Sequence, residues 1–184
     1  MICSYLIGGI SLQLKIVICG ILLFSSSVVG YLFSLRYSLR VKQISYLQNS
    51  LKGLETEILY YSTPLPMAMQ KTACRCNKSI SGIFDETFRL LNSRNGYSIE
   101  EAWKSAVLKQ INNTSLTKED AEIIIGFGKD LGVGDKEVQK SHFRFINILL
   151  DEQKNKAVYE QNKNGKMCNR LGILLGLAIV IILI

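Results

Sequence analysis

Two uncharged apolar runs, residues 16–35 and residues 171–184, lie at opposite ends of this chain of 184 residues. As a helix, the first run would cover about 30 Å, roughly the hydrocarbon core of a bilayer. The second run has fourteen residues and reaches eighteen when counted from Met167. Apart from Lys15, every charged residue lies between the two runs. This pattern predicts a membrane protein with spans at residues 16–35 and 167–184.

Each apolar run has an alternative interpretation. The C-terminal run is short enough to be an interfacial anchor instead of a full span. The N-terminal run could be a cleaved signal peptide, with Ser25–Ser27 as the small-residue cleavage region. However, this run stays apolar to Leu35 and is followed at once by Arg36, Arg40 and Lys42. Such a stop-transfer pattern favours an uncleaved anchor.

Basic residues without acidic neighbours border both runs on the side of the central segment. Because positive residues mark the cytoplasmic side of a span, we expect the middle of the chain to lie in the cytoplasm. Only Lys15 lies on the far side of the first run. The expected juxtamembrane basic residues are Arg36, Arg40, Lys42, Lys163, Lys166 and Arg170.

The net charge of +7 arises at these membrane boundaries. Residues 55–160 hold fourteen Lys and Arg against fifteen Asp and Glu. No basic stripe interleaved with aromatic residues appears there, which excludes a nucleic-acid-binding protein. A module that binds the lipid surface through its basic boundaries alone is a further alternative, and it predicts salt-sensitive membrane association.

The central segment reads as a series of helices, beginning with three. A helix from about Tyr37 to Ser62 would bury a stripe made of Ile44, Leu47, Leu51, Leu54, Ile58 and Tyr61. Thr63 is expected to cap a second helix, with Pro64 at its first position and its end near Cys76. A third helix would bury Ile80, Ile83, Phe84, Phe88 and Leu91 and end at Asn95-Gly96.

Three more helices follow. Ser98-Ile99-Glu100-Glu101 is a capping-box sequence, and the fourth helix after it would bury Trp103 as a core anchor, with Ala102, Ala106 and Val107. Thr117-Lys118-Glu119-Asp120 opens a fifth helix, which Gly132 ends and whose apolar stripe is Ile124, Ile125, Phe127 and Leu131. Asp135 caps a sixth with a seam of Val138, His142, Phe145 and Leu149.

The predicted fold class is all-α, because no period-two strand pattern competes with these helices. No helix-breaking residue appears between Asp135 and Gly165, so the sixth helix could continue into the C-terminal run as one rod of about 49 residues. The expected architecture is an antiparallel bundle at residues 36–166 between the two spans. Residues 1–15 form an N-terminal extension.

Sequence motifs for catalysis are weak. Cys74 and Cys76 form a CxC on the expected cytoplasmic side, and zinc would need two more ligands at suitable spacing. The single histidine, His142, is expected to be packed or hydrogen-bonded. Glycines at 126, 128, 132 and 134 follow a helix and lack the terminal Gly-Lys-Ser/Thr of a phosphate loop. We therefore expect no catalytic residue, cofactor or metal, although a membrane-bound enzyme or redox protein using Cys74, Cys76 and His142 remains an alternative.

A family resemblance is carried by residues spread along the central segment. The chain from about Leu14 to Ile184 resembles the stage III sporulation protein AB family of endospore-forming bacteria, and residues 1–13 extend beyond the family's usual start. The residues that carry the resemblance are Leu54-Glu55-Thr56-Glu57-Ile58, Tyr60, Thr63-Pro64-Leu65, Ala102-Trp103, Asp120, Glu122-Ile123, Phe127-Gly128, Leu131-Gly132, Asp135, Gln139 and His142.

The resemblance implies a six-helix antiparallel bundle like the cytoplasmic domain of type II secretion F platform proteins. It also implies a component of the mother-cell-to-forespore channel, located in the mother-cell membrane around the forespore. The implied partners are a cytoplasmic ATPase, stage III sporulation protein AA, and other stage III A channel proteins. The resemblance leaves room for a homo-oligomer. In a bundle that begins and ends at the membrane, Glu55, Glu57, Asp130 and Asp135 would lie near the far end as a partner interface, with Glu55 and Glu57 as solvated or partner-facing charges.

Overall fold

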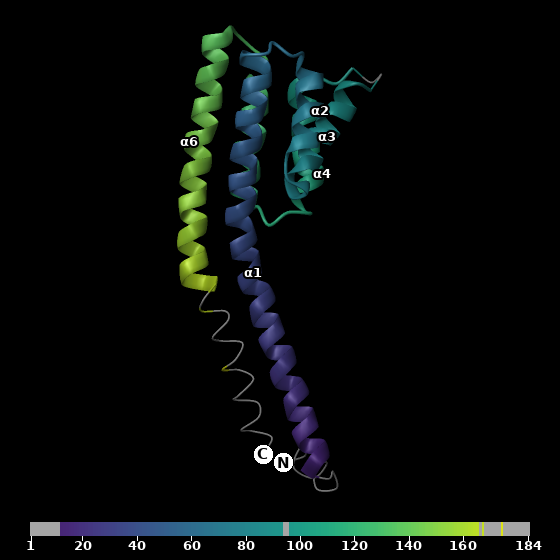
Figure 1. The fold of residues 1–184 in the computed structure, drawn as a ribbon, viewed down its shortest axis with the longest axis vertical. Coiled ribbons are helices and arrows are strands. Elements are labelled where there is room, and N and C mark those ends of the chain that lie inside the picture. Colours follow the sequence, from purple (N-terminus) through teal and green to yellow (C-terminus); the bar gives the residue numbers. More distant parts are fainter. Residues whose placement is uncertain (1–11, 94–95, 166, 168–173, 175–184) are drawn as a thin grey trace. The chain divides into compact units, whose positions relative to one another are not determined.

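The computed structural model describes residues 12–93, 96–165, 167 and 174, and the elements in these residues are all helical (Figure 1). This agrees with the all-α class expected from the sequence. The α-helices are α1 (Leu12–Leu59), α2 (Leu65–Arg75), α3 (Lys78–Leu91), α4 (Ile99–Ile111), α5 (Lys118–Asp130) and α6 (Lys136–Glu160). A short π-helix, η1 (Gln161–Gly165), follows α6.

The chain divides into two compact units, one of Ser38–Tyr159 and the other of Met1–Tyr37 with Glu160–Ile184. The first apolar run lies in α1. Over the described residues, no helix combines the length and apolar character needed to cross a bilayer. Most of residues 167–184 lie outside the described residues. The two membrane spans therefore stay predictions.

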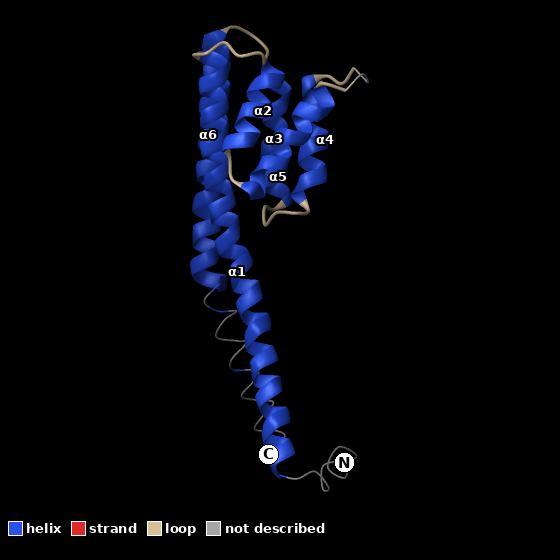
Figure 2. Cartoon of the chain, turned by 45° about the vertical axis from the view of Figure 1, so that its right-hand side comes forward, coloured by secondary structure: helices blue, strands red, loops and turns tan. Residues whose placement is uncertain are grey.

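The unit Ser38–Tyr159 is a helical bundle with a continuous apolar core. In it α2 packs on α3, α3 on α4 and α4 on α5. Figures 1 and 2 show α6 alongside the bundle part of α1. The largest fully buried side chains of the bundle include Trp103, Phe84, Phe143, Ile44, Leu47, Leu51, Leu54, Met69, Ile80, Ile83, Ile124 and Leu150.

The stripe predicted for the first helix is largely correct. Ile44, Leu47, Leu51 and Leu54 are buried, at alternating steps of three and four that place them on one face of α1. Tyr61 is the exception, because α1 ends at Leu59 and leaves this side chain exposed. The chain then turns through Ser62, whose φ of 50° is left-handed.

The helix starts follow local capping chemistry closely. Both predicted capping boxes are present, Ser98 with Glu101 before α4 and Thr117 with Asp120 before α5. Asp135 caps α6, since its Oδ1 accepts the Val138 N–H at 2.9 Å. The expectation for α2 is wrong by one position: Pro64 is the N-cap, without a side-chain cap bond. Thr63 instead donates its hydroxyl to Glu57.

Two other helix boundaries differ from expectation. α3 ends at Leu91 with Asn92 as its C-cap, so the helix ends before the predicted exit at Asn95-Gly96, of which Asn95 lies outside the described residues. Gly96 does have a left-handed φ of 67°. α6 ends at Glu160 and is followed by η1, so the described residues do not form one continuous α-helical rod beyond this point.

The predicted seam of α6 is wrong by one residue. Val138 and Phe145 are exposed, and His142 and Leu149 are only partly buried. The buried side chains are Phe143, Ile146, Leu150, Gln153 and Ala157. A shift of one residue rotates the buried face by about 100°. Phe143 takes the inward place and packs on Phe127 with its ring tilted, the ring centroids 5.2 Å apart.

Candidate functional site

Trp103 is the centre of the bundle core, as predicted. Its indole N–H donates to the Ile124 carbonyl at 2.6 Å, and the side chain is fully buried. Phe84 and Phe127 meet its ring edge to face, with centroids 5.6 and 5.8 Å away. Such pairs stabilise a core beyond their area burial. Trp103 therefore fixes α3 and α5 to α4.

Gly128 is required by this close packing of α5 on α4. A Cβ added at Gly128 would overlap the indole ring of Trp103. At Gly126, two residues earlier in α5, the same added atom would meet nothing within 4 Å. Gly132 serves a different need, because its φ of 81° lets the chain leave α5. Both predicted structural glycines thus have identifiable geometric reasons.

A buried ion pair between Arg40 and Asp120 ties α1 to the start of α5. Arg40 Nε donates to Asp120 Oδ2 at 2.8 Å, and a second guanidinium nitrogen donates to Oδ1 at 2.9 Å. Arg40 is 4% exposed and Asp120 is fully buried. Arg40 is therefore not an exposed charge, since its guanidinium is committed to this bidentate pair, and its expected place beside a membrane stays a prediction.

The ion pair belongs to a larger polar network that includes α6. Asp120 Oδ2 also accepts the Thr117 N–H at 2.8 Å, and Arg40 donates to Gln153 Oε1 at 3.2 Å. Gln153 in turn donates to Glu119, which pairs with Lys156 at 2.9 Å. The hydrogen bond between them lowers the pKa of Glu119 and raises that of Lys156. This network holds α1, α5 and α6 together at one end of the bundle.

Glu57 forms a second ion-pair cluster, between α1 and α2. Lys71 Nζ lies 2.8 Å from one carboxylate oxygen and Arg75 lies 2.8 Å from the other. The Thr63 hydroxyl donates to Glu57 at 2.9 Å. The hydrogen bond from Lys71 is the main reason that the pKa of Glu57 falls below its ordinary value. Because Glu57 is only 3% exposed, the expectation of a solvated or partner-facing charge is wrong for this residue.

The other acidic residues proposed as an interface remain accessible. Asp130 and Asp135 are exposed, and Glu55 is partly exposed. Asp135 also caps α6, and the Asp130 carbonyl lies 3.3 Å from His142 Nδ1. His142 is thus hydrogen-bonded, as expected. Their role as a partner interface stays a prediction.

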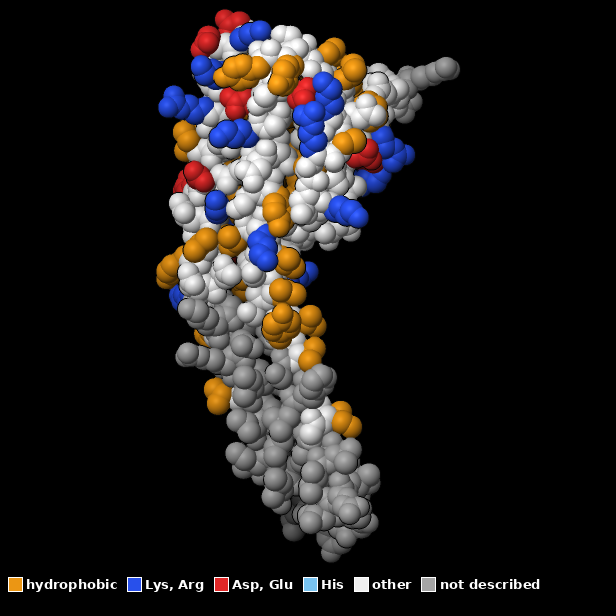
Figure 3. Space-filling model, in the orientation of Figure 1, with side chains coloured by type: hydrophobic (Ala, Val, Ile, Leu, Met, Phe, Trp, Pro, Cys, Tyr) orange, Lys and Arg blue, Asp and Glu red, His pale blue; other side chains and the backbone are white. Residues whose placement is uncertain are grey.

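The chain turns at residues 60–64 and 131–135 lie at the same end of the bundle, which we call the turn end (Figure 1). Lys136 Nζ donates to Ser62 Oγ at 3.3 Å and links the two turns. Tyr60 and Tyr61 are 76% and 70% exposed, and Val133 is also mostly exposed. Figure 3 shows hydrophobic side chains among charged ones at this end.

The sequence analysis did not predict the exposure of Tyr60, Tyr61 and Val133, which we call the turn-end patch. It placed Tyr61 on the buried stripe and gave Val133 no role. The available signal was the pair of consecutive tyrosines directly before Ser62-Thr63-Pro64, because a turn cannot bury two neighbouring bulky side chains on a single helix face. Exposed tyrosines at a turn are typical of protein contact surfaces.

Cys76 and His142 lie in different surface grooves. Cys76 lines a groove of about 250 Å³ between α1 and α2, whereas His142 lines one of about 210 Å³ between α5 and α6. Cys74 is exposed, and burial raises the pKa of the Cys76 thiol. In the part of the chain that the structure describes, no three His, Cys, Asp or Glu side chains come together as a metal site. The residues of the enzyme alternative are not assembled into one site.

The remaining basic residues divide by location. Arg36, Lys42 and Lys163 are exposed. Lys166 and Arg170 lie outside the described residues. Their proximity to a membrane stays a prediction.

Comparisons with known proteins agree on one family. The family model described as stage III sporulation protein AB matches residues 15–184. A stage III sporulation protein AB of Bacillus subtilis (strain 168) is 30% identical over 171 residues, which cover 93% of this chain and 99% of the relative. A solved structure of a stage III sporulation protein AB superposes with a TM-score of 0.63 at 30% identity, covering 68% of this chain and 98% of that one.

Proposed function

Because the chain belongs to the stage III sporulation protein AB family, a family of sporulation proteins, we propose that it is a non-catalytic membrane platform of the mother-cell-to-forespore channel. Residues 16–35 and 167–184 anchor it in the mother-cell membrane around the forespore. The bundle faces the mother-cell cytoplasm and transmits conformational work from a cytoplasmic ATPase, stage III sporulation protein AA, to the other channel proteins.

The membrane part of the proposal is supported by the apolar surface of the part of α1 that precedes Ser38. Residues 16–35 contain no charged side chain, and in α1 Ile21, Val29, Tyr31 and Leu32 are more than half exposed. Contiguous exposed apolar surface is costly in water and marks a membrane or protein contact. Membrane insertion predicts that the full chain stays in the membrane fraction after a wash in 1 M salt. A lipid-surface module held only by basic residues would be released, because salt screens surface charge.

The turn end is the proposed docking site for the ATPase, and the exposed pair Tyr60 and Tyr61 is the observation that carries this assignment. The bundle unit begins at Ser38 in α1 and ends at Tyr159 in α6, so within it α1 runs towards the turn at 60–64 and α6 runs away from the turn at 131–135. Along these two helices, the turn end is therefore opposite to the residues at which the chain leaves the bundle. Tyrosine is enriched among the residues that dominate protein interfaces.

Asp130 and Asp135 border this apolar patch in the proposed interface. Charged residues at an interface rim act mainly on association rate and partner choice. Asp135→Asn removes the charge of this position while keeping an N-cap, since Asn caps a helix as well as Asp. Combined with Asp130→Asn, it should slow ATPase binding at low salt and leave the helical content unchanged.

Affinity capture from sporulating cells tests the docking assignment. Tyr60→Ala/Tyr61→Ala should reduce recovery of the ATPase by about tenfold or more, which is the effect of losing one strong interface residue. The bundle should stay folded because both side chains are exposed. Leu108→Ala on α4 is the control, since Leu108 is half exposed but does not belong to the turn end. If the tyrosine variant recovered as much ATPase as the wild-type chain, the turn end would not be the docking site.

A further inference from the structure

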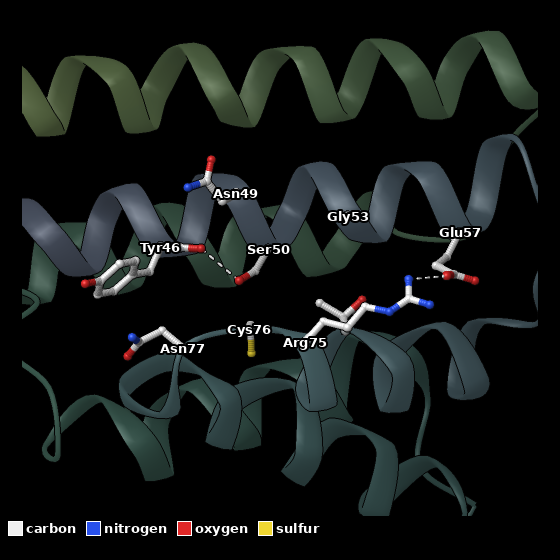
Figure 4. Close-up of a pocket in the computed structure, with 9 residues that line it drawn as sticks. Tyr46, Asn49, Ser50, Gly53, Glu57, Arg75, Cys76 and Asn77 are labelled. Atoms are coloured by element: carbon white, nitrogen blue, oxygen red, sulfur yellow. Dashed lines mark hydrogen bonds and ion pairs between the residues drawn. The ribbon is translucent and has the colours of Figure 1, made fainter.

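The groove between α1 and α2 has a mixed polar lining that includes none of the exposed turn-end residues Tyr60, Tyr61 and Val133. Its volume is about 250 Å³, enough for one or two side chains of another polypeptide. Tyr46, Asn77 and Cys76 border it towards one end, and Arg75 and Glu57 towards the other (Figure 4). Gly53 lies in the α1 wall, where an added Cβ would meet nothing within 4 Å. The absence of a side chain at Gly53 keeps the groove open.

The charge around this groove is positive. Glu57 is its single acidic lining residue, and two cations, Lys71 and Arg75, already pair with that carboxylate. The cluster therefore keeps a net charge of +1. From residue 58 to residue 84 the chain contains three basic residues, Lys71, Arg75 and Lys78, and no Asp or Glu. A ligand that complements this groove carries negative charge.

Hydrogen-bond donors are also available in the groove. Thr72 lines it and is 5% exposed, and its buried hydroxyl oxygen has no hydrogen-bond partner. Leaving a buried hydroxyl unpaired is unfavourable, so a ligand acceptor at this position would recover a lost bond. Arg75 carries five N–H donors, and its bond to Glu57 uses one of them. Its guanidinium is mostly exposed and can turn a planar fork towards a second carboxylate.

We propose that the α1–α2 groove binds an acidic segment of a partner protein, whose carboxylate accepts hydrogen bonds from Arg75 and the Thr72 hydroxyl. The inference does not depend on the platform role, because it rests on the groove's own shape, charge and unpaired hydroxyl. It gives the bundle a second contact surface, lined by α1, α2 and the residues after α2 and not by the turn-end tyrosines.

The test uses the full chain in detergent micelles and two fluorescein-labelled probes, octaglutamate and octaglutamine. Gly53→Leu fills the groove without changing charge, and replacing a helical glycine also favours the helix. Gly126→Leu is the matched control, because Gly126 is likewise helical with open space at its Cβ but lies in the α5–α6 groove. Arg75→Gln is a second variant, which removes the charge while retaining most of the side chain.

Fluorescence anisotropy should show octaglutamate binding to the wild-type chain and to Gly126→Leu with the same Kd. Gly53→Leu and Arg75→Gln should each weaken it by about tenfold or more, as expected for loss of a charge-assisted hydrogen bond. Octaglutamine should bind the wild-type chain at least about tenfold more weakly than octaglutamate. Circular dichroism checks that the variants keep wild-type helicity.

The proposal is wrong if the wild-type chain does not bind octaglutamate or binds both probes equally well. It is also wrong if Gly53→Leu binds octaglutamate with the wild-type affinity. Vesicles containing phosphatidylglycerol provide the last comparison. If Gly53→Leu weakens vesicle binding but not octaglutamate binding, the groove holds a lipid headgroup and the protein-segment proposal is wrong.

Discussion

At the scale of single residues, the contact between Gly128 and Trp103 limits what α5 can tolerate. A side chain at Gly128 must displace a fully buried indole that is also hydrogen-bonded to Ile124. Cores are packed densely enough that such an insertion shifts neighbouring side chains and backbone. Gly126, in the same helix, carries no such restriction.

Gly128→Ala should therefore destabilise the bundle by about 1–3 kcal/mol, the usual cost of overpacking. Gly126→Ala should stabilise it by about 0.5–1 kcal/mol, because alanine favours the helix and meets no neighbour. Urea unfolding of the full chain in detergent, followed by circular dichroism, measures both values. Equal effects of the two substitutions would mean that α5 does not approach Trp103 as described.

Arg40 and Arg36 provide a second comparison between close neighbours in α1. Arg40→Met should cost about 3–5 kcal/mol, because it leaves the Asp120 carboxylate buried without its ion-pair partner. Arg36→Met should change stability by less than about 0.5 kcal/mol, since Arg36 is exposed. The same unfolding measurement applies. If Arg40→Met proved as mild as Arg36→Met, the buried ion pair would not contribute to stability.

The position of Arg40 could not be inferred from the sequence. Its partner Asp120 lies 80 residues away, and both Arg36 and Arg40 follow an apolar run in the same way. Glu57 presented the same difficulty, because its cationic partners belong to the next helix and not to its own helix face. Partners distant in sequence decide whether a charge is buried, and local spacing does not report them.

At the scale of elements, local chemistry predicted helix starts well. The capping boxes at Ser98 and Thr117 were identified from four consecutive residues, because both bonds of the motif are made within that segment. The register of α6 was not recoverable in this way. Its sequence offers apolar residues one position apart, Phe145 with Ile146 and Leu149 with Leu150. Packing in the bundle core, where Phe143 meets Phe127, decides which residue of each pair points inward.

The capping box of α4 makes a pH-dependent contribution to stability. Hydrogen bonds from the Ser98 N–H and hydroxyl lower the pKa of Glu101 from its ordinary 4.5. A carboxyl with a lowered folded pKa stabilises the fold above its unfolded pKa, and this contribution is lost as pH falls through the folded value. Glu57 and Glu119 act in the same direction.

Glu101→Gln separates the hydrogen bond from the titration, because Gln at this position also completes a capping box. Between about pH 6 and pH 3 the variant should lose less unfolding free energy than the wild-type chain, since one titrating carboxyl has been removed. Urea unfolding at several pH values gives both profiles. Parallel profiles would show that Glu101 has the same pKa in the folded and unfolded chain.

At the scale of the whole molecule, the proposal predicts that the bundle faces the cytoplasm. Cys74 is exposed and Cys76 is partly exposed, so both report which side of the membrane α2 occupies. In intact spheroplasts a membrane-impermeant maleimide should leave both thiols unmodified, and it should modify Cys74 first once the membrane is broken. Peptide mapping by mass spectrometry distinguishes these positions from Cys3, Cys19 and Cys168. Modification of Cys74 in intact spheroplasts would reverse the topology.

Docking of the cytoplasmic ATPase at the turn end can be tested by site-specific photocrosslinking in sporulating cells. p-Benzoylphenylalanine at Tyr60 places a crosslinker on the exposed patch, and the same residue at Leu108 places one on α4, away from the turn end. If the turn end is the docking site, position 60 should crosslink to stage III sporulation protein AA and position 108 should not. A crosslink from position 108 without one from position 60 would contradict it.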